Sequence, residues 1–516
     1  MGYQSSDTLL QLIQTLEKSE KRHFKLYIKR SSAKEDLKII RLFDALVTMG
    51  DYDEKVLMKK IPCDTRSQLA NLKAHLYKEV LASLRLLKTT DNTDLQLSEL
   101  LDNARILYNK GLKLQSLHLL EKAKDLAKAN QKFNALVQVV SLEKKIETLH
   151  ITRSSLDKTQ TLTDEALIVS SHIDRVTRLS NLALLLYRWY VQNGHSRNEE
   201  DERRVRDYFK DSYPKDANLI NGFYEKLYLY QSYVWYAFIR QDFLMYYRYS
   251  QKWIDLFGQH KPMSGVETGH FIKGFHNLLD AHFVLRNYKK FAITLKQFEE
   301  FAETNEAQQH DNFRIHTSIY INSAKVNLNL MRGTFDEGLL LVPKVIANLK
   351  EYMLLVDSHR ILVFNYKIAS LYFGAGNYST AIDYLQKIIN DNQPGLRNDL
   401  QCYTRLMHLL CHYELGNEEI IESLIKSLYR FMSKMQTLTA VEGEIFQFLR
   451  YSCKVSARDI QPELEKFLQK VKLLENKRFQ SRTFAYLDII SWVESKVYKK
   501  TMAEIIQEKY KYSRHR

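Results

Sequence analysis

Residues 365–394 carry the clearest pattern of hydrophobic and polar positions in the chain. Two apolar faces at helical spacing flank a short turn at 374–377, and Ala369 and Ala381 place one small residue on each side of it. Apolar residues recurring at helical spacing predict amphipathic helices, and the Gly-containing turn predicts an antiparallel pair. We expect the two helices to cross closely at the alanines and to share an apolar face made of Ile368, Ala369, Tyr372, Phe373, Ala381, Tyr384, Leu385 and Ile388.

The same turn recurs along the chain. Residues 330–335 precede the clearest copy and 413–417 follow it, while 239–243 and 285–288 are weaker copies and 108–111 is a fair one. The later copies lie roughly 40–47 residues apart, longer than the roughly 34 of a tetratricopeptide repeat. One helix pair cannot bury its apolar face alone, so a series of pairs predicts stacking.

The series resembles the tetratricopeptide repeat (TPR), in which a small residue, a Tyr, a Gly turn, a second Tyr, an Ala and a closing Pro follow one another. Residues 365–394 match best, departing at Ile388, where the family has Ala, and at Pro394, which falls one place late. The resemblance implies an all-α fold: a right-handed α-solenoid of stacked antiparallel helix pairs, with an N-terminal helical cap or small helical domain.

The turns and polar segments divide the chain into four regions. They are an N-terminal helical domain (1–90), the first helical repeats (98–200), a TPR-like repeat array (221–435) and a C-terminal helical cap with a basic tail (436–516).

Local composition adds boundaries within these regions. The polar segment 89–97 predicts a linker, and the Ser/Thr-rich segment 152–163 predicts a joint before a long helix around 167–190. Pro343 falls inside a predicted helix and predicts a kink or break there. The tail, 501–516, reads as a basic amphipathic helix that frays.

Composition indicates a folded, basic, cytoplasmic protein. The net charge is +15 and the sequence pI about 9.2, which suits either solvated helical faces, the interpretation we favour, or contact with an anionic partner. The four cysteines are scattered and suggest no disulfide framework. No apolar run is long enough to predict a membrane span, and the N-terminal residues lack the order of a secretory signal.

Residues 1–90 leave two interpretations open. Their order of short helix, turn and long helix invites comparison with helix-turn-helix DNA readers. In that case basic residues of the last helix, over 65–88, would contact nucleic acid: Arg66, Lys73, Lys78 and Arg85. We favour an N-terminal cap or divergent first repeat, because that helix is long, the turn holds Pro62 and no wing strands follow.

Chemical motifs are absent or weak. The sequence has no Walker loop, nucleophile elbow or kinase signature. His408 and His412 share a helix face as zinc ligands would, but Cys411 points away from them and no catalytic Glu accompanies them. We therefore expect no metal, no cofactor and no enzymatic activity.

The most distinctive composition is aromatic. Tyr, Trp and Phe crowd residues 223–257. Tyr and Trp favour recognition surfaces, but bulky rings also fill the space between stacked helices, and we favour the core for most of them.

The TPR resemblance also implies a binding surface. In that family the first helix of each pair lines the concave face, where extended peptides bind. Carrying those positions over predicts partner-binding residues at Tyr228, Gln231, Trp235, Lys273, His276, Asp280, Tyr320, Asn327, Tyr366, Ser370, Phe373 and Tyr403. The family's clamp for a peptide carboxylate needs Lys and Asn, and His276 and Asp280 take those places, so the clamp is not supported.

The sequence therefore predicts a non-catalytic scaffold or adaptor that binds a protein or peptide. The alternative is a regulator whose residues 1–90 bind nucleic acid while a TPR-like array acts as the sensor.

Overall fold

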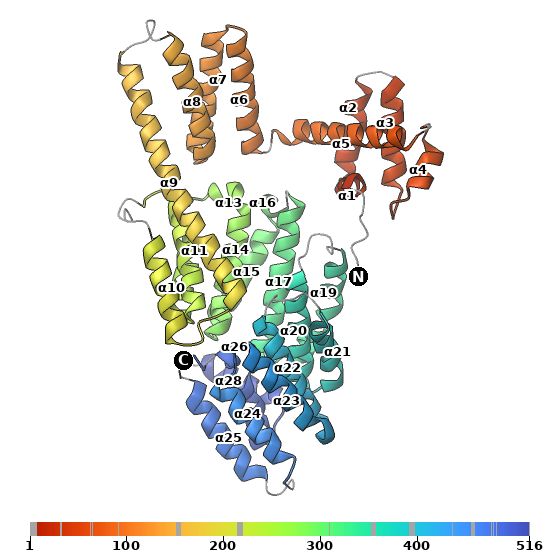
Figure 1. Ribbon diagram of the computed structural model, residues 1–516, viewed down its shortest axis with the longest axis vertical. Helices are drawn as coiled ribbons and strands as arrows, with labels where there is room; N and C mark the ends of the chain where they lie inside the picture. The colour runs from red at the N-terminus through yellow and green to blue at the C-terminus, as the bar shows by residue number, and fades with distance from the viewer. Residues whose placement is uncertain are drawn as a thin grey trace. The chain divides into compact units, whose positions relative to one another are not determined.

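All regular secondary structure in the computed structural model is α-helical (Figure 1). The residues described are 8–30, 34–61, 63, 65–90, 92–150, 156–213, 220–308, 310–351, 358–391, 398–435, 437–455, 460–475, 477, 479–480 and 482–514. None of them forms a strand, so the all-α prediction is confirmed. The chain divides into two compact units, Met1–Ser171 (unit 1) and His172–Arg516 (unit 2). The predicted four-region boundaries stay predictions.

Unit 1 begins with five helices around one apolar core. The N-terminal cap of α5 is Thr65, whose hydroxyl accepts a hydrogen bond from the Gln68 backbone N–H. The apolar side chains of α5, Leu69, Leu76 and Val80 among them, pack against α2 and α3. The five helices are α1 (Thr8–Thr15), α2 (Lys18–Lys29), α3 (Lys34–Val47), α4 (Glu54–Lys60) and α5 (Arg66–Lys88).

Two breaks predicted in the second half of unit 1 are shorter than expected, because a helix begins inside each of them. Asn92 caps α6, so that helix starts inside the predicted linker 89–97, where burial of Leu97 outweighs the polar composition. A long helix likewise begins inside the predicted joint 152–163, where Leu162 is buried, and its Glu165 pairs with Lys124 at 2.8 Å. The helices are α6 (Thr93–Asn109), α7 (Lys113–Ala129), α8 (Phe133–His150) and α9 (Leu156–Asn193), the last contributing to both units.

Unit 2 stacks its helices largely in chain order (Figure 1). The first helices of three successive pairs, α14, α17 and α20, also contact one another directly. The helices are α10 (Glu199–Ser212), α11 (Phe223–Ile239), α12 (Phe243–Gln259), α13 (Met263–Val266), α14 (Thr268–Val284), α15 (Tyr288–Ala302), α16 (Asn305–Gln308), α17 (Asp311–Arg332), α18 (Phe335–Leu339), α19 (Val342–Glu351), α20 (Ser358–Gly374), α21 (Tyr378–Ile389), α22 (Asn398–Glu414), α23 (Glu418–Lys434), α24 (Ala440–Ser452), α25 (Ile460–Glu475), α26 (Arg482–Tyr486), α27 (Ile489–Val497) and α28 (Met502–Arg514).

The turns between helices share one hydrogen-bond pattern. After α20, Gly376 has φ 79°, and the next backbone N–H, that of Asn377, donates to the Tyr372 carbonyl at 2.9 Å. This is the Schellman arrangement, which satisfies the last carbonyls of a helix. The same five-residue bond and positive φ occur after Gly111, Gln131, Gln241, Arg286, Gly333, Gly376, Gly416 and Lys499.

The pair predicted at 365–394 forms as expected. Ala369 and Ala381 are fully buried where α20 and α21 meet. The side chain of Asn377 accepts a hydrogen bond from the Thr380 N–H and caps α21. Pro394 lies outside the described residues, as do Pro62 and Pro214.

The predicted break at Pro343 is confirmed. Helix α18 ends at Leu339, and a new helix, α19, begins one residue before the proline. Pro is tolerated in a first helical turn because its missing N–H would have no partner there.

The prediction of a fraying tail is wrong for residues 502–514. Helix α28 packs along α17, with Ile506 buried and the Gln507 amide donating to the Gly333 carbonyl at 3.0 Å. A side-chain Cβ on Gly333 would lie 2.8 Å from the Ala503 carbonyl oxygen, so glycine permits this close approach.

A buried carboxylate links α9 to α11. Glu225 pairs with Arg175 at 2.6 Å and lies 3.2 Å from His172. Burial alone would raise the pKa of Glu225, but hydrogen bonds from the Gly222 backbone N–H and from Arg175, together with the charge of His172, lower it overall. The ion pair therefore positions the segment of α9 that reaches the site described next.

Candidate ligand-binding cavity

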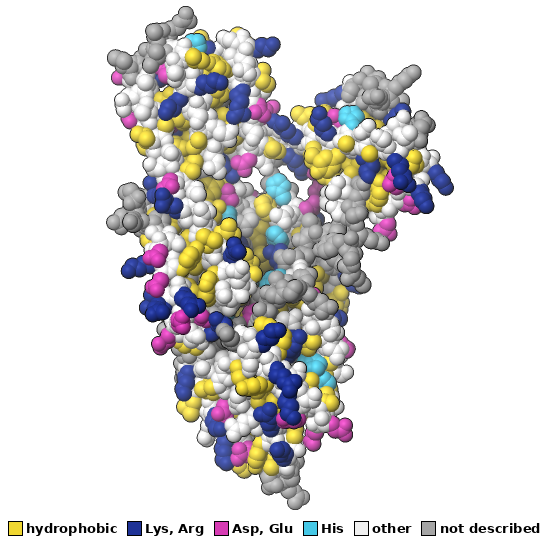
Figure 2. All heavy atoms as spheres, in the orientation of Figure 1, with side chains coloured by type: hydrophobic (Ala, Val, Ile, Leu, Met, Phe, Trp, Pro, Cys, Tyr) yellow, Lys and Arg dark blue, Asp and Glu magenta, His cyan; other side chains and the backbone are white. Residues whose placement is uncertain are grey.

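A cavity of about 420 Å³ opens within unit 2. Its walls come from α9, α11, α12, α14, α17 and α20, together with Leu400 and Tyr486. Figure 2 shows His side chains within a recess of this unit. Seven of the twelve predicted binding residues line the cavity: Trp235, Lys273, His276, Asp280, Asn327, Tyr366 and Ser370.

The other five predicted residues lie beside the cavity or away from it. Tyr320 stacks on His276, with ring centroids 4.2 Å apart. Tyr228 and Gln231 both contact His270.

The last two of the twelve lie toward the C-terminal helices. Phe373 faces a second cavity. Tyr403 is fully buried beneath the ring of Tyr486, at 4.4 Å, so its ring belongs to the core.

One wall of the cavity is aromatic. The ring centroid of Trp235 lies 4.5 Å from that of Tyr187 and 5.7 Å from that of Tyr190, and both tyrosines belong to α9. Within the aromatic-rich segment 223–257 five of the fourteen rings are buried in the core and the other nine are half-buried. The favoured interpretation, that most of them are core, is therefore met only in part. The five buried rings are Phe223, Tyr236, Tyr246, Trp253 and Phe257.

The cavity lining also carries two lysines. Lys367 donates a hydrogen bond to the Ser323 hydroxyl at 2.5 Å. Burial disfavours its ammonium and lowers its pKa to about 8, although the charge of Asp280 acts in the other direction. The Lys273 ammonium lies 5.8 Å from the Trp235 ring centroid.

Histidine charge contributes little to the cavity lining at neutral pH. Burial, followed by the charges of Lys273, Lys367 and Arg360, holds the pKa of His276 well below its usual range. His276 is therefore a neutral ring that stacks, and it does not act as a cation.

Two carboxamides in the wall have polar atoms without hydrogen-bond partners. Asn277 Nδ2 and Asn327 Oδ1 are buried and make no hydrogen bond within the described part of the chain. The two residues are 4% and 6% exposed, and both line the cavity. Buried polar groups are nearly always paired, so these two atoms call for a ligand or water.

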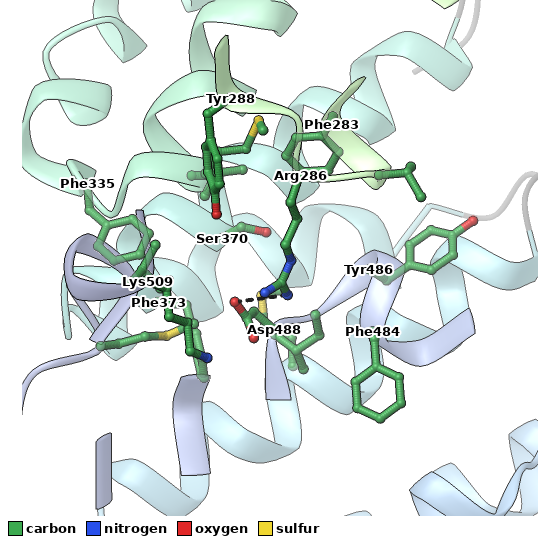
Figure 3. A pocket seen from close by; sticks show the side chains of 17 residues that line it. Phe283, Arg286, Tyr288, Phe335, Ser370, Phe373, Phe484, Tyr486, Asp488 and Lys509 are labelled. Carbon is green, nitrogen blue, oxygen red and sulfur yellow. Dashed lines mark ion pairs between the residues drawn. The ribbon is translucent and has the colours of Figure 1, made fainter. Parts of the chain in front are cut away.

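The second cavity, of about 130 Å³, adjoins the first and shares Ser370 and Tyr486 with it. Figure 3 shows the Arg286 side chain directed at Asp488, with an N–O distance of 3.4 Å. Burial would raise the pKa of Asp488, but Arg286, Lys509 and hydrogen bonds from Ser491 lower it. Since its charges are paired, this cavity has the character of a structural joint to the C-terminal helices.

The predicted residues make up seven of the twenty-four that line the cavity. Among the residues not predicted are the polar side chains of Lys367, Ser323 and Asn277, and no sequence signal marks them. The walls from α9 and from Tyr486 are remote in sequence, and no repeat pattern predicts them.

In the described residues, neither the His408–His412 pair nor the cysteines belong to a metal site. The rings of His408 and His412 lie 4.5 Å apart, and burial, followed by the neighbouring cations, lowers the pKa of His408 to about 4. No cluster of three or more His, Cys, Asp or Glu that could hold a metal occurs in the described ranges.

The basic residues proposed for nucleic acid are mostly bonded within unit 1. Arg66 pairs with Glu54 at 3.4 Å and Arg85 with Asp102 at 3.3 Å. Lys73 donates to the Tyr52 hydroxyl, and Lys78 is exposed. The nucleic-acid alternative stays a prediction, and these contacts give it no support.

No family model matches the sequence, and no curated protein is similar to it. Among the helices that the structure describes, none is both long and apolar enough to cross a membrane.

Proposed function

We propose that the protein is a non-catalytic, cytoplasmic scaffold that receives a segment of a protein or peptide partner in the cavity of unit 2. Its array would be a right-handed, TPR-like α-solenoid. The observation that carries the proposal is the convergence of seven predicted binding residues, from α11, α14, α17 and α20, on one cavity.

The regular succession of helices supports the solenoid. Consecutive pairs pack in chain order, and the same hydrogen-bonded turn closes one helix after another. Repeats that contact mainly their neighbours build such arrays, and their inner helices present a continuous binding face.

The size and lining of the cavity suit a segment of a partner. A volume of about 420 Å³ falls within the roughly 300–1,000 Å³ of ligand pockets. Aromatic walls such as those of Trp235 and Tyr190 bury an apolar side chain at low entropy cost, while the polar wall from α14 and α20 fixes its orientation.

Site-specific photocrosslinking tests this proposal. A benzophenone amino acid replaces Val363 in the cavity wall, and a matched variant carries it at Leu244, which is 70% exposed on α12. We expect one discrete protein or peptide to be captured from lysate at position 363, not at 244, and the capture to be lost with Trp235→Ala. Equal capture at both positions, or none at 363, would refute the proposal.

A further inference from the structure

We infer that the α14–α17–α20 wall of the cavity is a subsite for an anionic group, a carboxylate or phosphate, carried by the ligand. The wall residues of this anion subsite are Lys273, Asn277, Ser323, Asn327 and Lys367. The inference rests on the proposed function, since it names the chemistry of the group that the cavity receives.

Lys367 is the centre of the anion subsite. Its only hydrogen bond in the described structure is to Ser323, a neutral hydroxyl. None of the ion pairs within the described ranges includes Lys367 or Lys273. Buried charges in proteins are normally paired. The largely buried ammonium of Lys367 feels the charge of Asp280 but forms no ion pair within the described ranges, so it can take a counter-ion from a ligand.

Lys273 brings a second cation to the same wall from α14. Its ammonium lies between two rings, 5.8 Å from the centroid of Trp235 and 5.9 Å from that of Tyr320. Cation–π contacts stabilise an ammonium without neutralising it, so the positive charge is kept available to a ligand.

The two carboxamides add hydrogen-bonding capacity. The unpartnered Asn277 Nδ2 is a donor, and a donor beside two ammonium groups matches the oxygens of a carboxylate or phosphate. The unpartnered acceptor, Asn327 Oδ1, suits a neighbouring N–H or O–H of the same ligand. An amide next to a carboxylate, or a hydroxyl next to a phosphate, supplies that combination.

The remaining charges facing the wall leave it positive. Among the described residues that line the cavity, Asp280 is the one carboxylate, and it accepts a hydrogen bond from the Tyr246 hydroxyl at 3.4 Å. Arg360, next to the cavity, donates to the Tyr320 hydroxyl. Three histidines also line the cavity: His195 bonds the Phe238 carbonyl, His276 is neutral, and His359 is the third. Two ammonium groups against one carboxylate favour an anion over a cation or a neutral group.

Direct anion binding to the full-length protein tests the subsite. Inorganic phosphate and acetate are titrated by calorimetry at constant ionic strength, with chloride as the reference anion. We expect the wild type to bind at least one of them at millimolar concentration, and Lys367→Met and Asn277→Leu each to weaken binding about tenfold or more. Lys290→Met, an exposed lysine bonded to Tyr247, is the matched control and should bind like the wild type.

Tighter binding of phosphate than of acetate would indicate that the ligand carries a phosphate, and the reverse order would indicate a carboxylate. Absence of binding to the wild type, or unchanged binding by Lys367→Met, overturns the subsite. Because crosslinking at Val363 is read separately, its success alongside failed anion binding would leave the proposed function standing and remove only the anion subsite.

Discussion

Replacing Lys367 by Met should stabilise unit 2 at neutral pH. The fall of the Lys367 pKa from 10.5 to about 8 corresponds to roughly 3 kcal/mol of unfavourable burial, at about 1.4 kcal/mol for each pH unit. Met keeps the length of the side chain, while loss of the hydrogen bond to Ser323 costs about 1 kcal/mol. The net expected gain in the free energy of unfolding is therefore about 2 kcal/mol at pH 7.

The stability difference between Lys367→Met and the wild type should depend on pH. A lysine whose folded pKa is depressed binds fewer protons in the folded than in the unfolded state between the two values, so wild-type stability rises with pH in that window. The penalty is complete below about pH 8 and fades toward pH 10.5. The advantage of Lys367→Met should therefore shrink steadily across that range.

Urea unfolding followed by tryptophan fluorescence provides the assay. All four tryptophans, at 189, 235, 253 and 492, belong to unit 2, so the signal reports on the unit that holds Lys367. Measurements in phosphate-free buffer at several pH values should show the difference between variant and wild type decreasing as pH rises. A difference that does not change with pH, or a variant less stable at pH 7, would refute the reasoning about the buried ammonium.

Four further substitutions test the helix turns and the buried ion pair, each by the shift in its urea unfolding transition. Gly374→Ala should lower the free energy of unfolding by about 3 kcal/mol, because the added Cβ would lie 2.3 Å from ring atoms of Phe335. Gly376→Ala should lower it by only about 1 kcal/mol, because that position has φ +79° but no neighbour within 4 Å. Equal losses for the two variants would contradict this. Lys499→Gly should raise the free energy of unfolding by about 0.5 kcal/mol, because glycine adopts the φ of 51° at this position without strain. A variant less stable than the wild type would show that the turn is unstrained. Glu225→Gln should lower the free energy of unfolding by about 3 kcal/mol near neutral pH. Because the folded pKa of Glu225 is lowered, that deficit should begin to shrink as pH falls below the unfolded value of 4.5 and should be gone below the folded pKa; a deficit that persisted there would exclude the ion pair as its source.

The repeat pattern predicted much of the local structure because it records burial directly. Ala369 and Ala381 are small where α20 and α21 cross, and both are fully buried. The turns at Gln131 and Lys499 were missed because the sequence signal for a left-handed residue is Gly, and here residues with side chains adopt that conformation. The linker at 89–97 was too long because polar composition does not report that Leu97 is buried.

The candidate site was predictable only where it follows the helical repeat. Trp235, Lys273 and Tyr366 recur on the first helices of pairs, and the TPR resemblance assigned these positions to one face. The contribution of Tyr486, by contrast, depends on where the C-terminal helices pack. Sequence periodicity holds information about contacts between neighbouring repeats, and almost none about contacts between segments more than a hundred residues apart.

The packing of α28 along α17 sets the order in which parts of unit 2 can fold during translation. Gln507 bonds Gly333 across 174 residues, a stretch that takes roughly 10–35 s to synthesise at about 5–20 residues per second. During that interval the apolar surface that Ile506 later covers, near Phe335, has no partner. This part of the α17 surface therefore stays uncovered until α28 has been synthesised and can pack against it.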